Sequence, residues 1–99
     1  MFEEAMRLRQ ELVRLLESDF DHPEAGPALW ALGKLYDPAL RPLFERALHH
    51  HLERNANVLY QAIIALNNLG VEFPEAHGAF AFNDVERNRA MAKAHLARS

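Results

Sequence analysis

Apolar residues recur at intervals of three and four along five segments of this 99-residue chain, with polar residues between them. This spacing places apolar side chains on one face of an α-helix. No segment shows the strict alternation typical of a half-buried strand. The pattern therefore predicts an all-α fold of about five helices. They cover residues 2–18, from 23 or 27 to 36, 38–54, 58–69, and from 83 or 84 to 98.

Proline, asparagine and glycine mark the ends of these helices. Asp37 before Pro38 predicts an N-cap followed by the first helical position. Asn55 offers a cap to the next helix, and Gly70 suits the left-handed conformation that closes it. Pro42 lies about one turn into its helix, where backbone amides still lack intrahelical partners, so we expect it to be tolerated.

The helix predicted over residues 58–69 is apolar around most of its circumference, which is typical of a central, buried element. The segment after it is irregular but contains Phe73, Phe80 and Phe82. A loop with three such rings is expected to pack onto the body of the protein, because each ring removes a large apolar area from water.

One apolar pattern occurs twice, 34 residues apart: residues 28–38 read ALWALGKLYDP and residues 62–72 read AIIALNNLGVE. The alanines allow two helices to approach closely, and the leucines fill the space between them. A period near 34 with two helices per unit is typical of helical repeat proteins. We therefore predict that the two segments are the inner helices of successive antiparallel hairpins, stacked because neither buries its apolar face alone.

The run ALGKLYDPALRPLFERAL resembles the junction between HEAT repeats, and VLYQAIIALNNLG is similar to the second helix of that family. The resemblance covers roughly residues 12–70 and implies a short HEAT-like α-solenoid. On this interpretation the chain is a single domain. It comprises a first helix pair (1–36), a second pair (37–70), and the aromatic loop with a C-terminal capping helix (71–99).

Departures from the HEAT pattern point to a binding surface. Leu59 stands where the family usually has a basic residue, and other positions that are normally polar on the inner helices are apolar here. Two units are also fewer than the roughly three that such stacks need, so the aromatic loop or a partner must cover this surface. Large apolar anchors dominate protein interfaces. The predicted partner-binding residues are Trp30, Leu59, Tyr60, Ile63 and Ile64.

The three consecutive histidines, His49 to His51, suggest two alternatives. Adjacent residues on a helix point about 100° apart and do not converge on one ion. Glu45, His49 and Glu53 share a face, however, so an open metal or small-ligand site centred on His49 and Glu53 is one alternative. The other is a polar helix end at which histidine complements the helix dipole. We adopt the second and expect no metal and no cofactor.

Composition excludes several classes of function. The chain has no cysteine and a formal charge of −3, and no apolar run approaches the roughly 20 residues of a membrane span. The acidic, amphipathic N-terminus is unlike a signal peptide, so we expect a soluble, cytoplasmic protein with no membrane partner.

No nucleophile motif, phosphate-binding loop or zinc spacing occurs. His22, His77 and His95 stand alone and are expected at the surface. We therefore predict no enzymatic activity but a protein–protein interaction module: a small scaffold or adaptor of unknown partner that could form a homodimer.

A nucleic-acid accessory role is a further alternative, since the last predicted helix contains Arg87, Arg89, Lys93 and Arg98. Because the net charge is negative, we expect no binding to random DNA or RNA at physiological salt. Fluorescence anisotropy with labelled oligonucleotides measures this. A micromolar complex that weakens steeply with salt, and is lost when Arg87 and Arg89 are neutralised, would contradict the expectation.

Overall fold

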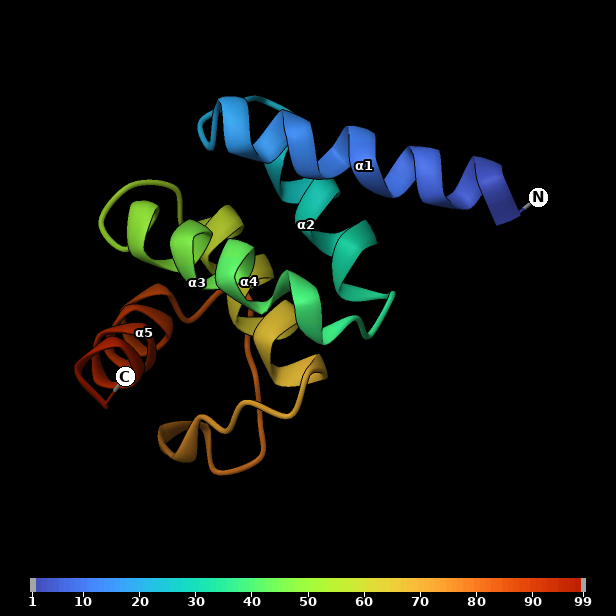
Figure 1. Cartoon of the computed structure of the whole chain (residues 1–99). Helices are drawn as coiled ribbons and strands as arrows, with labels where there is room; N and C mark the ends of the chain where they lie inside the picture. The colour runs from blue at the N-terminus through green and yellow to red at the C-terminus, as the bar shows by residue number, and fades with distance from the viewer. Residues whose placement is uncertain (1, 99) are drawn as a thin grey trace.

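The computed structural model describes residues 2–98, with side chains from residue 3 onward. No strand occurs in this part of the chain, so the predicted all-α fold of five helices is confirmed (Figure 1). None of the helices described is both long and apolar enough to cross a membrane. In chain order, the five α-helices and two short 3-10 helices of the described residues are α1 (Phe2–Ser18), α2 (Ala25–Gly33), the 3-10 helix η1 (Pro38–Leu40), α3 (Arg41–His50), α4 (Ala56–Asn68), the 3-10 helix η2 (Pro74–Ala76) and α5 (Val85–Arg98).

Helix α4 lies at the centre and packs against α2, α3 and α5 (Figure 1). Because neighbours cover it on several sides, its apolar residues extend around most of its circumference, and the predicted central position is confirmed. Its buried residues are Val58, Leu59, Ala62, Ile63, Ala65 and Leu66.

The two segments with the repeated pattern lie side by side, since α2 packs more extensively against α4 than against any other element. A Cβ atom added to Gly33 would lie 3.2 Å from both Cα and Cβ of Ala65, so the backbones approach closely here. Asn68 Nδ2 also donates a hydrogen bond to the carbonyl oxygen of Gly33 (3.1 Å). Close approach through small residues is confirmed, while the solenoid stacking stays a prediction.

The predicted helix ends are found with their capping bonds. Asp37 accepts a hydrogen bond from the Ala39 amide (3.0 Å). Asn55 Oδ1 accepts bonds from the amides of Asn57 and Val58 (3.0 and 3.1 Å). Gly70 has φ +90°, as its position after α4 requires.

Helix α3 differs from its prediction at the C-terminal end. It stops at His50, four residues before the expected Arg54, and His51 takes the C-cap position. Pro42 lies in the first turn of this helix, where its missing N–H removes no intrahelical bond.

The aromatic loop packs onto the body as predicted, but not with all three rings. Phe73 is buried, Phe80 is half-buried, and the two rings meet edge to face at 6.3 Å. Phe82 is exposed, and its ring meets that of Tyr60 on α4 with centroids 5.9 Å apart. The loop therefore covers part of the apolar surface of α4 and leaves the α2 side uncovered.

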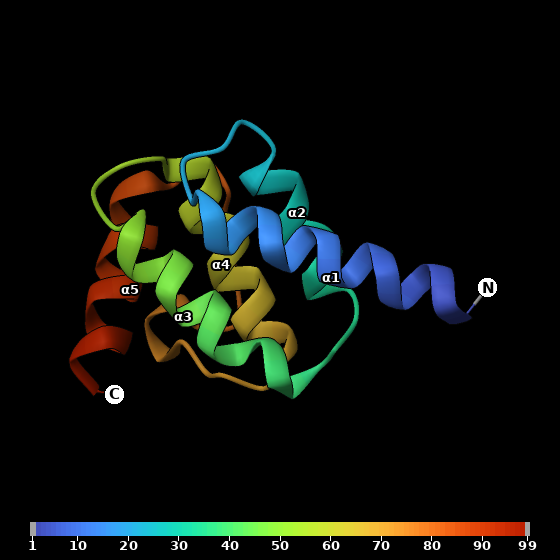
Figure 2. The same ribbon diagram turned by 45° about the horizontal axis from the view of Figure 1, so that its top comes forward.

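Helix α1 is anchored at one end only. Leu16 in its last turn is fully buried, whereas residues 3–8 are all exposed. In both views the N-terminal turns extend beyond the rest of the molecule (Figures 1 and 2). Between these ends, Arg9 Nη2 pairs with Asp37 Oδ2 at 2.8 Å, which ties α1 to the turn after α2.

Two adjacent isoleucines test the orientation of α4. Ile63 is 0% exposed whereas Ile64 is half-buried. We expect Ile63→Ala to lower the free energy of unfolding by about 2–5 kcal/mol, because it leaves a cavity in the core. Ile64→Ala is the matched control and should cost less than half as much. Urea denaturation measures both variants, and equal losses would contradict the orientation.

Candidate functional site

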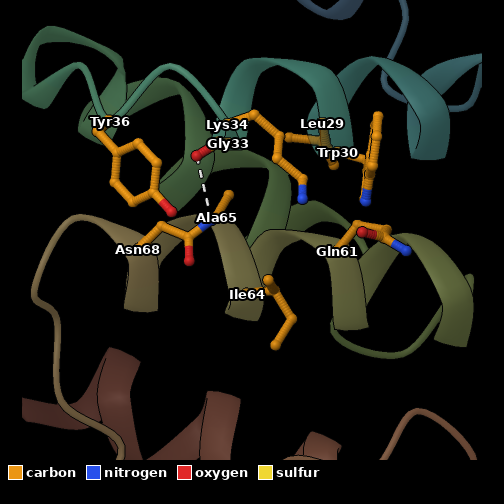
Figure 3. Close-up of a pocket in the computed structure, with 9 residues that line it drawn as sticks. All are labelled: Leu29, Trp30, Gly33, Lys34, Tyr36, Gln61, Ile64, Ala65 and Asn68. Carbon is orange, nitrogen blue, oxygen red and sulfur yellow. Dashed lines mark hydrogen bonds between the residues drawn. The ribbon is translucent and has the colours of Figure 1, made fainter.

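A groove between α2 and α4 encloses a cavity of about 130 Å³ (Figure 3). Trp30 and Ile64, which occupy equivalent positions in the repeated pattern, both line it. The full lining set is Leu29, Trp30, Gly33, Lys34, Tyr36, Gln61, Ile64, Ala65 and Asn68. The internal repeat therefore supplies both walls of the groove.

Trp30 stands at one end of this groove, and Tyr36 stands at the other (Figure 3). The Trp30 side chain is 55% exposed. Lys34 lies one turn later on the same helix face, with Nζ 4.7 Å from the centroid of the indole ring. This cation–π contact orients the ring without burying it.

Tyr36 joins the groove to a second cavity of about 430 Å³ between α1 and the turn after α2. Its side chain is 63% exposed, and its φ of 51° lies in the left-handed region. That conformation costs a non-glycine residue about 1–2 kcal/mol. The residues lining this second cavity are Ala5, Met6, Arg9, Leu35, Tyr36, Asp37 and Pro38.

Exposed apolar side chains concentrate around these two cavities. Among the described residues, five of the six large apolar side chains that are exposed precede residue 37. Four of these five line one or both cavities, and the half-buried Ile64 adjoins them. We call this surface the Tyr36 face and define it by Met6, Trp30, Leu35, Tyr36 and Ile64.

The charges beside the Tyr36 face are partly compensated. Asp37 accepts hydrogen bonds from the Ala39 amide and from Arg9, and these hold the pKa of its carboxyl below its usual value. The Arg9–Asp37 pair is therefore fully ionised near neutral pH. Lys34, in contrast, makes no ion pair within residues 2–98. The face thus combines an apolar centre with an unmatched positive charge at its edge.

The predicted partner-binding residues divide into two groups. Trp30 is exposed, and Tyr60 and Ile64 are half-buried. Leu59 and Ile63 are 0% exposed, so their prediction as contact residues is wrong. They lie four residues apart on the side of α4 that faces the core, and the neighbouring helices cover them completely.

Sequence reasoning missed Met6, Leu35 and Tyr36. Helix α2 was expected to continue to Tyr36, where Leu35 would belong to its buried stripe. It ends at Gly33 instead, and both side chains turn outward. Gly33 is the last residue of α2 and is not among the glycines with positive φ, so no left-handed glycine cap signals this earlier end.

The structure does not assemble the alternative metal site around His49 and Glu53. Glu53 pairs with Lys93 at 2.9 Å, and this contact holds the pKa of Glu53 below its usual value. Glu45 instead contacts His95 Nε2 at 2.6 Å, and His49 is exposed. His95, expected at the surface, is 5% exposed and lies among the core residues. Neither carboxylate is left to complete a site with His49.

The basic residues of α5 are occupied by other parts of the chain. Arg87 donates to the carbonyl oxygens of Glu75 and Ala76, and Arg89 donates to that of Leu52. Lys93 and Arg98 pair with Glu53 and Glu75. These contacts hold α5 against its neighbours. They give each of the four basic residues a structural role.

Comparison with models of protein families, with curated proteins and with solved structures finds no match for this chain. The likeness to HEAT repeats therefore stays a prediction that rests on residues 12–70. Functional inference consequently depends on the geometry and chemistry of the Tyr36 face.

Two substitutions at Tyr36 separate backbone strain from contact with a partner. Glycine adopts a positive φ without a steric penalty, so Tyr36→Gly should be about 1 kcal/mol more stable than Tyr36→Ala. Both variants remove the same exposed ring. Thermal and urea unfolding compare them. Equal stability of the two variants would contradict a strained Tyr36.

Proposed function

We propose that this chain is a protein–protein interaction module that binds through the Tyr36 face and has no catalytic activity of its own. The observation that carries the proposal is Tyr36 itself. An aromatic ring is held in a left-handed backbone conformation, largely in solvent, between two adjoining cavities. Strained residues of this kind persist where the surrounding structure fixes them, often at binding sites.

The chemistry of the face supports a protein occupant. Contiguous exposed apolar surface with a polar edge is typical of interfaces, and Trp and Tyr are common anchors in them. The Trp30 ring is already oriented by Lys34, and the backbone of Tyr36 is held in one conformation, which lowers the conformational entropy lost on binding. Lys34 favours a partner with an acidic group next to its apolar side chains.

A second copy of the chain has this chemistry. The projecting half of α1 places Glu3 and Glu4 beside exposed Met6 and Leu8. An acidic, apolar helix end of one copy complements the apolar, lysine-edged groove of another. Because Met6 also belongs to the Tyr36 face, the contact can be reciprocal, as a two-fold dimer requires. A homodimer is therefore the occupant we favour.

The mass in solution tests this proposal. We expect light scattering over a concentration series to show a dimer, and Tyr36→Ala to weaken it by at least about tenfold, the effect of losing a strong anchor. Phe82→Ala removes an equally exposed ring away from both cavities and is the matched control. Trp30 is the only tryptophan, so its emission should shift to the blue as the dimer forms.

A monomer at every concentration would overturn the dimer and leave a different protein as occupant. A photo-crosslinking amino acid at position 34 should then join one defined protein that the same group at position 82 does not. Identical products from the two positions would contradict a specific binding face altogether.

A further inference from the structure

Asp21, His50 and His51 meet where the turn between α1 and α2 adjoins the C-terminal end of α3. One ligand atom from each of the three side chains lies within 4.8 Å of the other two. We propose that these residues bind a divalent transition-metal ion of the zinc type. Imidazole nitrogens with a carboxylate oxygen are a ligand set that such ions accept. The site lies apart from the Tyr36 face, and neither proposal depends on the other.

The two histidines converge because the helix ends between them. His50 is the last residue of α3, and His51, with φ −95° and ψ 9°, is already its C-cap. Their ring centroids lie 4.8 Å apart with the planes at 77°. The expectation that adjacent histidines point apart holds within a helix but is wrong at this terminus.

His51 provides the strongest indication of a ligand. Its side chain is 1% exposed, and its Nε2 lies 2.6 Å from the carbonyl oxygen of Phe20. A carbonyl oxygen only accepts, so Nε2 carries the proton and Nδ1 holds a lone pair. Nδ1 is buried and has no hydrogen-bond partner in the structure. A histidine that donates one N–H to a backbone carbonyl and keeps the other nitrogen free has the usual arrangement of a metal ligand.

The side chains of Asp21 and His50 are already in contact. His50 Nε2 lies 3.0 Å from Asp21 Oδ2. The bond from His50 and the pair with Arg54 hold the pKa of Asp21 below its usual value, so its carboxylate is ionised near neutral pH. A zinc ion at this point would take a ring nitrogen of His50 and a carboxylate oxygen of Asp21 as ligands.

The geometry needs only a small adjustment. Ligands about 2.1 Å from a tetrahedral ion lie about 3.4 Å apart, so separations that now reach 4.8 Å must shorten by up to about 1.4 Å. The side chains of His50 and Asp21 are 33% and 44% exposed and can rotate, while buried His51 provides the fixed position. Three protein ligands leave the fourth position to water.

Arg54 competes for the same carboxylate. It donates two hydrogen bonds to Asp21, at 3.2 and 3.1 Å, and its side chain is 58% exposed. Its positive charge opposes a bound cation. Removing Arg54 should therefore strengthen metal binding, even though it breaks the ion pair with Asp21. Removing Asp21 or His50 should weaken it.

Calorimetric titration with zinc chloride tests the site. We expect one ion per chain, and affinity at least about tenfold lower in Asp21→Asn and His50→Gln. His49→Gln, in the same histidine run but exposed and outside the three-residue cluster, is the matched control and should bind as the parent does. Arg54→Gln should bind more tightly. Buried His51 is left unchanged so that every variant keeps its core.

Thermal unfolding with and without zinc provides a second measurement, because an ion that binds only the folded chain raises Tm. Tm should rise in the parent and in His49→Gln, and not in His50→Gln. Absence of binding to the parent would overturn the site. An equal loss in His49→Gln and His50→Gln would do so too, because it would indicate non-specific binding by the histidine run.

Discussion

The close packing of α2 against α4 is the contact on which the rest of the structure depends. Gly33 lies against the backbone of Ala65, and the alanines of the repeated pattern keep the two helices close along their length. Larger residues here would separate the helices and open the core, since packed interiors tolerate little extra volume. The Asn68 bond to the Gly33 carbonyl fixes the same contact where α2 ends.

This contact also positions the proposed binding surface. Helix α2 ends at Gly33, where it lies close against α4, and the exposed Leu35 and Tyr36 follow immediately. Asp37 then restarts helical structure through its cap and holds α1 through Arg9. The groove, its aromatic ends and the neighbouring cavity adjoin this one turn between α2 and η1.

Charged and polar side chains hold the outer elements onto this centre. Glu45 contacts the buried His95, Glu53 pairs with Lys93, and Arg89 donates to the Leu52 carbonyl oxygen, so α5 is joined to α3 and to the turn that follows it. At the C-terminal end of α3, His50 contacts Asp21 and the buried His51 contacts the Phe20 carbonyl oxygen, which connects this end to the turn after α1. In this second group of contacts, the buried Nδ1 of His51 has no hydrogen-bond partner. The group is therefore a candidate metal site as well as a structural contact.

The sequence by itself determined the fold class, the helix caps at Asp37 and Asn55, the central role of α4 and the close approach of the repeated segments. These features depend on local pattern: hydrophobic period, capping chemistry and residue size. The tertiary structure alone decided which apolar residues stay exposed. Leu59 and Tyr60 are neighbours in sequence, yet only the placement of helices around α4 buries the first completely. The tertiary structure also brought Asp21 together with His50 and His51. These residues lie about 30 positions apart, and only the packing of the helices brings them together, because local spacing does not encode such contacts.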